Sequence, residues 1–315
     1  MKLGEKDVCQ NSDTYIIAEM SANHMQNIER AKQIIKEAKM AGADAIKIQT
    51  YRPDPITVDC YGNEFLCTPG SPWEGMNLYE LYKTTYTPWE WHDELFECAK
   101  KNEIDMFSTP FDLTAVDFLD KYNMPAYKIA SYEINDIPLI KKVAMKKKPI
   151  IISTGLATLS DIELAVNTCK AVGNNNIILL KCVSEYPTPY ADMNIKTLIN
   201  MSETFRCITG LSDHSLGSSV AIAAVALGAK VIEKHFTLSR KDGGADASFS
   251  MEPEEFAKMV SDIRNVEQSL GEVSYELSER QKKSRERSRS LYIVEDIKKG
   301  EIFTEKNIKS IRPGY

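Results

Sequence analysis

The sequence has little histidine, no paired-cysteine motif, no long apolar run and no excess of positive charge. Only four of its 315 residues are histidine, and its seven cysteines are scattered without a CxxC pair. An odd number of unpaired cysteines argues against a disulfide framework and favours a reducing compartment. No stretch approaches the ~18 apolar residues of a membrane span, and the first residues lack the apolar core of a signal peptide. We therefore expect a soluble, cytoplasmic protein.

The composition is that of an ordinary globular protein. A hydrophobic fraction of 43% and a charged fraction of 27% argue against disorder or a fibrous class. The net charge of −6 argues against a general nucleic-acid or anionic-membrane binder, although a local basic pocket for a small phosphate compound stays compatible with it. The length suits one barrel domain, which typically takes about 250 residues, with a short appendage.

Short apolar runs alternate with helical patterns along most of the chain. Eight runs predict strands: Tyr15–Glu19, Ala45–Gln49, Asp105–Thr109, Ala126–Ala130, Pro149–Ser153, Ile177–Lys181, Cys207–Leu211 and Val231–His235. This alternation is typical of a parallel sheet wrapped by helices. Eight β/α units with none left over favour closure into a (β/α)8 TIM barrel over residues 1–270, and a doubly wound open sheet is the alternative.

The expected helices carry recognisable end signals. The first predicted helix, 28–43, has apolar residues at helical spacing and stops at Gly42, a residue suited to a helix C-terminus. A later helix over 159–172 is expected to begin with a Ser/Asp cap. The last, 253–270, begins with Pro253 and two acidic residues, which suit the positive end of a helix dipole.

Two segments interrupt the alternation. Residues 52–87 form a long insertion after the second predicted strand, rich in proline, glycine and aromatic residues. Insertions at that end of a barrel commonly form part of the active-site wall or a lid. Residues 271–289 are strongly polar and predict a linker. Residues 290–315 predict the start of a small β-rich module, which we expect to be cut short.

Polar residues cluster where the predicted strands end. In a barrel the carboxyl ends of the strands face the active site. The polar residues at these ends are Glu19, Lys47, Gln49, Thr109, Lys128, Ser131, Glu133, Ser153, Lys181, Ser184, Tyr186, Ser212, Asp213, His214, Glu233 and His235. A set this polar predicts an active site rather than a structural rim.

Two of the four histidines, His214 and His235, end adjacent predicted strands. Neutral imidazole is a favoured ligand for manganese, iron and zinc, and two ligands leave coordination positions for water and substrate. The pair therefore predicts a divalent-metal site. The alternative is that each histidine only hydrogen-bonds to neighbouring loops.

Lys47 and Lys128 lie within otherwise apolar strands, where a charge is costly without a negative partner. With nearby hydroxyl groups they could bind a phosphate and a carboxylate. The hydroxyl groups are those of Thr109, Ser131, Ser153 and Ser212. The alternative pairs Lys47 with Glu19 and Lys128 with Glu133 in internal salt bridges.

Four motifs resemble the sialic acid synthase family of nonulosonate synthases. They are YKIASYE (127–133), KCVSEYPTPYADMN (181–194), GLSDHS (210–215) and IEKHF (232–236). The resemblance runs from about residue 15 into the tail. Segments such as IAEMSANH, GADAIKIQTYRPDPIT and TPWEWH resemble the pseudaminic acid branch more than the N-acetylneuraminate or legionaminate branches. The tail after residue 290 resembles the opening of the antifreeze-like (SAF) domain of these enzymes.

The resemblance implies condensation of phosphoenolpyruvate with the aldehyde of a diacetamido-trideoxy-altrose, giving a nine-carbon nonulosonic acid and phosphate. His214 and His235 would bind Mn2+ or Mg2+. The positions that match phosphoenolpyruvate contacts are Lys47, Thr109, Lys128, Ser131, Ser153 and Ser212. Those that match sugar-orienting or proton-transfer positions are Glu19, Gln49, Glu133, Tyr186 and Asp246, with Glu133 expected to position a water or hydroxyl.

Two further residues carry implications from the resemblance. Ser184 stands where the sialic acid branch tends to carry an amide side chain, which suggests a different sugar. Arg312 matches an arginine that reaches into the partner subunit's active site and contacts the substrate acyl group. The resemblance therefore implies a domain-swapped homodimer, provided that the full C-terminal domain is present.

Three other functions remain open at this point. An N-acetylneuraminate or legionaminate synthase would keep the chemistry and change the sugar. A metal-dependent barrel hydrolase would use the histidines but leave Lys47 and Lys128 without a task. A catalytically idle sugar-binding barrel would need neither metal nor turnover.

Overall fold

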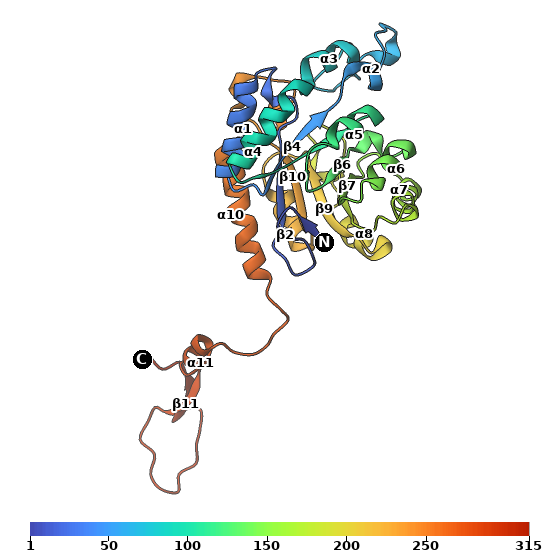
Figure 1. Ribbon diagram of the computed structural model, residues 1–315. Helices are drawn as coiled ribbons and strands as arrows, with labels where there is room; N and C mark the ends of the chain where they lie inside the picture. The colour runs from blue at the N-terminus through green and yellow to red at the C-terminus, as the bar shows by residue number, and fades with distance from the viewer. Residues whose placement is uncertain (315) are drawn as a thin grey trace. The chain divides into compact units, whose positions relative to one another are not determined.

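The computed structural model describes residues 1–314, in which eight parallel strands close into a barrel surrounded by helices (Figure 1). The strands are β3 Tyr15–Glu19, β4 Ala45–Thr50, β5 Asp105–Pro110, β6 Tyr127–Ile129, β7 Ile150–Ser153, β8 Ile177–Lys181, β9 Ile208–Asp213 and β10 Val231–His235. Each pairs with the next, and β10 pairs in parallel with β3 to complete the ring. The (β/α)8 prediction is confirmed, and the open-sheet alternative is wrong.

Helices follow the strands around the ring. The α-helices of the barrel unit are α1 Ile28–Met40, α2 Pro53–Ile56, α3 Leu78–Thr85, α4 His92–Lys101, α5 Leu113–Leu119, α6 Ile137–Met145, α7 Leu159–Ala171, α8 Thr197–Phe205, α9 Ser219–Ala226 and α10 Pro253–Leu270. Short 3-10 helices are η1 Ser21–His24, η2 Asn63–Phe65, η3 Trp89–Trp91, η4 Ser131–Glu133, η5 Tyr190–Asp192, η6 Arg240–Asp242 and η7 Ala247–Phe249. No helix among residues 1–314 is both long and apolar enough to cross a membrane.

The barrel strands are buried on both faces. All four residues of β7 and the first four of β8 are buried, because one face packs inside the barrel and the other beneath the helices. This explains why the strands read as continuous apolar runs instead of alternating patterns. All seven cysteines are free, as the scattered pattern predicted.

Two helix ends can be compared with their predictions. Helix α1 ends at Met40 and Gly42 follows with φ +88°, a left-handed conformation that glycine adopts without strain. The predicted Ser/Asp cap of α7 is wrong. Thr158 caps this helix, and its side chain and that of Asp161 form a reciprocal capping box.

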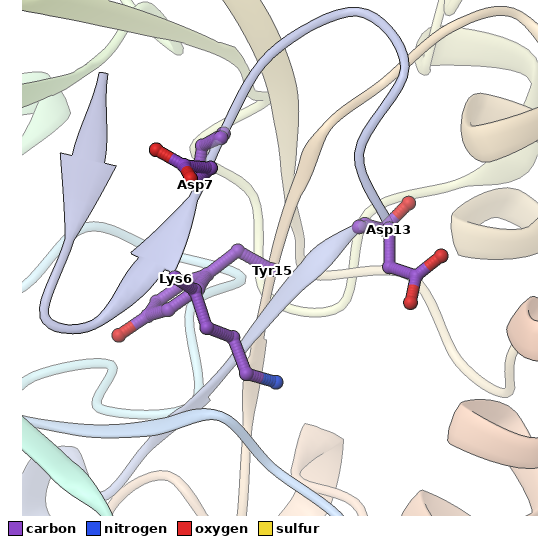
Figure 2. A pocket seen from close by; sticks show the side chains of 6 residues that line it. Lys6, Asp7, Asp13 and Tyr15 are labelled. Atoms are coloured by element: carbon purple, nitrogen blue, oxygen red, sulfur yellow. The ribbon is translucent and has the colours of Figure 1, made fainter.

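A hairpin that the sequence did not predict lies at the N-terminal end of the barrel. It consists of β1 Lys2–Leu3 and β2 Lys6–Asp7, and it buries Leu3. Figure 2 shows a small open hollow beside it, lined by Lys6, Asp7, Asp13 and Tyr15 among others. Because Tyr15 begins β3, this hollow lies at the opposite end of the barrel from the strands' carboxyl ends.

The insertion is folded, with α2, η2 and α3 standing beyond the carboxyl end of β4 (Figure 1). A backbone bond from Cys67 N to Met76 O at 2.8 Å closes its central loop. Asn77 caps α3 and also donates to Cys60 O at 2.7 Å, which ties the loop to the helix.

The chain divides into two compact units, residues 1–270 and a second unit that begins at Gly271. In the second unit, β11 Ser290–Ile293 and β12 Ile308–Ile311 form an antiparallel pair, as expected for the start of a small β-rich domain. The segment predicted as a linker contains a helix, α11 Glu279–Arg285. A capping box between Ser278 and Gln281 accounts for its start.

Gly210 allows β9 to approach β10 closely. A Cβ atom at this position would collide with the backbone carbonyl of Val231 and with the Leu180 side chain. We predict that Gly210→Ala lowers the free energy of unfolding by about 1–3 kcal/mol, because a packed strand pair must separate to admit the methyl group. Chemical denaturation measures this change.

The matched control is Gly314→Ala, because an added Cβ there meets no atom within 4 Å. Its unfolding curve should coincide with that of the unmodified protein. Equal stability of Gly210→Ala and the unmodified protein would show that β9 and β10 are not as closely packed as described.

Candidate functional site

All predicted site residues except one lie in barrel strands, most of them near the carboxyl ends, or in the loops that follow the strands. Glu19 ends β3, Lys47 and Gln49 lie in β4, Thr109 in β5, Lys128 in β6, Ser131 and Glu133 in η4, Ser153 ends β7, Ser184 and Tyr186 follow β8, Ser212 lies in β9, His214 follows it, His235 ends β10 and Asp246 precedes η7. The exception is Arg312, which follows β12 in the second unit.

Two buried lysines share one carboxylate inside the barrel. Lys47 Nζ lies 3.2 Å from both Glu19 Oε2 and Glu233 Oε2, and Lys128 Nζ lies 3.8 Å from Glu233 Oε1. The expected pairing of Lys47 with Glu19 is therefore present. The alternative pairing of Lys128 with Glu133 is wrong, because Lys128 contacts Glu233 from β10 instead.

These four groups shift one another's proton affinity. Burial raises the pKa of Glu19 above its usual value despite the nearby Lys47. Burial alone would raise the pKa of Glu233 as well, but Lys128 and Lys47 outweigh it and hold that pKa low. Burial lowers the pKa of Lys128 to about 8 against the attraction of Glu233. With Glu19 protonated, two cations face a single carboxylate, which favours binding of an anion.

Hydroxyl groups lie against both lysines. Lys128 Nζ donates to Ser153 Oγ at 2.6 Å, and Lys47 Nζ donates to Thr109 Oγ1 at 3.3 Å. Ser212 Oγ donates to Glu233 Oε1 at 3.1 Å. Each is a directional donor or acceptor beside a charge, which is the arrangement that an oxyanion ligand requires.

Gly155 adds a backbone N–H to this region. Its N–H donates to Ser131 Oγ at 3.0 Å. A Cβ atom on Gly155 would collide with the side chains of Ser131 and Ser184 and press on Cys182. Ser184 Oγ has no hydrogen-bond partner within residues 1–314 although it is buried. Glycine thus allows the side chains of Ser131, Ser184 and Cys182 to lie close to the backbone, and the unpartnered Ser184 hydroxyl group can still bond to a ligand.

His214 and His235 lie side by side, with ring centroids 5.4 Å apart. The Nδ1 atom of His214 lies 2.8 Å from the Val183 carbonyl oxygen. It must carry a proton to donate there, which leaves Nε2 free as a ligand. Burial lowers the pKa of His235 well below its usual value, and its Nδ1 has no hydrogen-bond partner among the described residues. Burial would lower the pKa of His214, but Cys182 and the Val183 carbonyl raise it. In its neutral form each ring therefore has a nitrogen that can act as a ligand.

The histidine pair fits a partial ligand set for a divalent cation. Within residues 1–314, no three or more His, Cys, Asp or Glu side chains group as a metal site would require. Two imidazoles would leave the other coordination positions to water and substrate oxygens. Hydrogen bonding to loops accounts for His214 Nδ1 but not for His235 Nδ1. The metal site stays a prediction.

An aromatic wall borders the histidines. The Tyr186 ring lies 4.3 Å from that of His214, and Phe249 lies 5.1 Å from His235. Trp73, from the insertion, packs 5.8 Å from Tyr186, and its indole N–H donates to Ala245 O at 2.9 Å. The insertion thus lies beside the histidine pair, as a wall or lid would.

A chain of polar contacts connects Glu19 with the loop after β10. Gln49 Nε2 donates to Glu19 Oε1 at 2.9 Å and to Ser21 Oγ at 3.0 Å. The Ser21 hydroxyl donates in turn to Asp246, whose Oδ2 lies 4.0 Å from His235 Nδ1. Ser21 has φ +45°, which is uncommon for a residue with a side chain and frequent at functional sites.

Sequence reasoning missed four residues that the structure brings to this region. They are Ser21, Trp73, Cys182 and Phe249. The Sγ atom of Cys182 lies 3.8 Å from His214 Nδ1, and its place directly after β8 was a usable signal. Burial alone would raise the pKa of this thiol, but His214 and Lys128 lower it to about 7.

Glu133 is a carboxyl group with little to stabilise its charge. Burial raises its pKa to about 7, and Oε2 has no hydrogen-bond partner in the part of the chain that the structure describes. A carboxyl that ionises near neutral pH can both accept and donate a proton, which is what acid–base catalysis requires.

Comparison with known proteins gives a consistent result. The model of the NeuB family matches residues 34–275. A pseudaminic acid synthase from Campylobacter jejuni is 46% identical over 301 residues, which cover 96% of this chain and 88% of that protein. An N,N'-diacetyllegionaminic acid synthase from the same species is 38% identical over 306 residues, or 95% of this chain and 90% of the relative.

A solved structure shares the fold. The N-acetylneuraminic acid synthetase of Leptospira borgpetersenii, in complex with citrate, superposes with a TM-score of 0.80 and is 32% identical. The match covers 91% of this chain and 95% of that chain. Similarity at this level extends beyond the barrel architecture that many unrelated enzymes share.

The raised pKa of Glu133 predicts a pH-dependent stability difference. The folded protein holds this proton up to about pH 7, whereas an unfolded glutamate releases it near pH 4.3, so burial destabilises the fold increasingly as pH rises between these values. Glu133→Gln cannot ionise. Relative to the unmodified protein, its free energy of unfolding should rise by about 3 kcal/mol between pH 4 and pH 8.

Chemical denaturation across that pH range measures the difference. The control is Glu163→Gln, which makes the same substitution at an exposed glutamate on α7. A Glu133→Gln curve that runs parallel to that of the unmodified protein would contradict the raised pKa.

Proposed function

The chain belongs to the NeuB family of sialic and pseudaminic acid synthases, and on that basis we propose that it is a pseudaminic acid synthase. It condenses phosphoenolpyruvate with the open-chain aldehyde of a diacetamido-trideoxy-altrose, giving a nine-carbon nonulosonic acid and phosphate. The observation that carries this proposal is the pair of buried lysines with their hydroxyl partners beside two neighbouring histidines.

Phosphoenolpyruvate needs a site for two anionic groups on one small molecule. Lys128 with Ser153, and Lys47 with Thr109, provide two cationic positions joined by Glu233. Ser131 and Ser212 supply further hydroxyl groups, and Ser131 is held by Gly155. The charge of the lysines also stabilises phosphate as it departs.

His214 and His235 would hold a divalent cation, Mn2+ or Mg2+, which would supply Lewis-acid chemistry to the sugar aldehyde. The histidines hold and orient this part of the site. Asp246, Gln49 and Glu19 form the polar chain beside it and are placed to orient the sugar hydroxyl groups. Tyr186 and the aromatic residues around it exclude bulk water from the same side.

The bond changes balance as follows. C3 of phosphoenolpyruvate forms a bond to the aldehyde carbon, whose oxygen becomes a hydroxyl by taking up a proton. Water then adds at the electron-deficient C2, and Glu133 accepts the proton that this water loses. Cleavage of the bond between C2 and the phosphate oxygen yields the 2-keto acid and inorganic phosphate, which takes up the proton of the C2 hydroxyl group. The proton held by Glu133 balances the one taken up at the aldehyde oxygen. Glu133 suits this step because its pKa of about 7 lets it ionise at neutral pH.

Two observations support the pseudaminic acid branch. Identity to a pseudaminic acid synthase is 46%, against 38% to a diacetyllegionaminic acid synthase. Ser184 is short, and its unpartnered hydroxyl leaves more room in the sugar pocket than an amide side chain would. A barrel hydrolase explains the histidines but gives Lys47 and Lys128 no task.

We predict phosphate release from phosphoenolpyruvate only when the diacetamido-trideoxy-altrose is present, and complete loss of release after chelation. The assay compares this sugar with N-acetylmannosamine and the legionaminate precursor, with and without added Mn2+. Turnover of N-acetylmannosamine but not of the altrose derivative would disprove the branch. Hydrolysis of a sugar in the absence of phosphoenolpyruvate would instead indicate a hydrolase. Binding of a sugar without any turnover would indicate an idle sugar-binding protein.

We also propose that, where the full C-terminal domain is present, Arg312 acts in the partner subunit of a domain-swapped homodimer and contacts the substrate acyl group. The prediction is complementation: Arg312→Ala and Lys128→Ala are each inactive alone, but refolded mixtures regain activity. In the mixed dimer, one intact barrel meets one intact arginine. If the refolded mixture is only as active as the two variants added together, the domain swap is disproved.

A further inference from the structure

A second buried ion pair lies between β9 and β10, separate from the lysine network. Asp213 and Lys234 are direct partners in the strand register, with Lys234 Nζ 2.7 Å from Asp213 Oδ2. Their side chains are 0% and 1% exposed. Ser212 and Glu233, one position earlier on each strand, meet inside the barrel. Because side chains alternate along a strand, Asp213 and Lys234 face the surrounding helices instead.

The ion pair holds the turn that contains His214. Asp213 Oδ1 accepts hydrogen bonds from the Ser215 N–H at 2.9 Å and from Ser215 Oγ at 2.7 Å. Lys234 Nζ donates to the Ser215 carbonyl oxygen at 2.6 Å. The amide, hydroxyl and carbonyl groups of Ser215 are thus all bound by the pair, and His214 lies between two fixed residues.

The same pair also fixes the position of the second histidine. Lys234 directly precedes His235, so the contact of its ammonium with Asp213 and Ser215 ties the end of β10 to the turn after β9. The backbone carbonyl group of each histidine is held by a different loop. The His214 carbonyl accepts from Thr188 N at 3.0 Å, and the His235 carbonyl accepts from Met251 N at 2.9 Å.

Stability alone does not explain a buried ion pair. The desolvation of two charges commonly offsets their attraction, and a well-packed apolar pair is often at least as stable. What an apolar pair could not supply is the directional hold on Ser215.

From these contacts we infer that Asp213 and Lys234 are positioning residues that set the spacing and orientation of His214 and His235 for a divalent cation. The inference rests on the proposed function only in taking the histidine pair as the metal site. Groups that orient metal ligands without touching the metal commonly change its affinity by roughly 10- to 100-fold when replaced.

The test measures Mn2+ binding to the substrate-free protein by electron paramagnetic resonance of the unbound ion. The variant is Asp213→Asn together with Lys234→Met, which removes both charges and leaves neither buried alone. We expect Mn2+ to bind roughly 10- to 100-fold more weakly, with the thermal midpoint in chelator close to that of the unmodified protein. Lys234→Arg alone keeps the positive charge and the hydrogen-bond donors. It should therefore lose less Mn2+ affinity than the double variant does.

The matched control is Asp117→Asn together with Lys142→Met. This pair has the same two residue types with a 2.6 Å contact, and it links α5 to α6 on the outer surface. Its Mn2+ affinity should be unchanged. A second reference, His214→Ala, tests the metal site itself and should lose Mn2+ binding.

The outcomes separate the two proposals. If His214→Ala loses Mn2+ while the Asp213/Lys234 double variant binds it normally, the positioning role is wrong and the metal site stands. If the double variant loses affinity only together with a large fall in the midpoint in chelator, its role is structural and the inference is overturned. If His214→Ala binds Mn2+ normally, the metal site is wrong and the positioning role falls with it.

Discussion

The burial of two lysines inside the barrel is the constraint on which the rest of the site depends. An ammonium group removed from water loses its proton or gains a counter-charge. Here Glu233 is shared between Lys47 and Lys128, while burial raises the pKa of Glu19. The lysines are therefore paired well enough to remain charged. Part of their positive charge is still uncompensated, and this part can attract an anionic ligand. Complete pairing would stabilise the fold and abolish the attraction.

The strands were predictable because each is buried on both faces. Tyr15–Glu19, Ile177–Lys181 and Val231–His235 match their predicted bounds, since a continuous apolar run ends in a polar residue at the barrel rim. Strand β9 runs two residues further than its apolar pattern, because Ser212 and Asp213 continue the ladder against Glu233 and Lys234. An apolar pattern cannot detect strand residues whose partners are polar. The β1–β2 hairpin and α11 were missed because both are short and largely polar.

Strand position was enough to predict which residues lie in the site. It was not enough to predict which side chains contact one another there. The strand-end rule located Glu233, but the alternative salt bridge considered for Lys128 paired it with Glu133, five residues away along the chain. Barrel closure instead brings the inward side chain of β10 within reach of lysines on β4 and β6. Trp73 illustrates the other limit. An insertion of this length is recognisable as a wall or lid, yet nothing in its composition indicates which aromatic residue meets Tyr186.

Strands β9 and β10 explain why the rim and the outer layer of this barrel act together. Ser212 with Glu233 faces the lysines, and the next pair, Asp213 with Lys234, faces the helices. The histidines follow directly and return to the interior. Successive side chains of a strand point to opposite faces. The residue before His235 therefore points outward, where Lys234 can hold the strand end without entering the barrel. Burial lowers the pKa of Lys234, whereas Asp213 and, less strongly, Glu255 on α10 oppose that shift, so the charge on α10 acts on this outer ion pair.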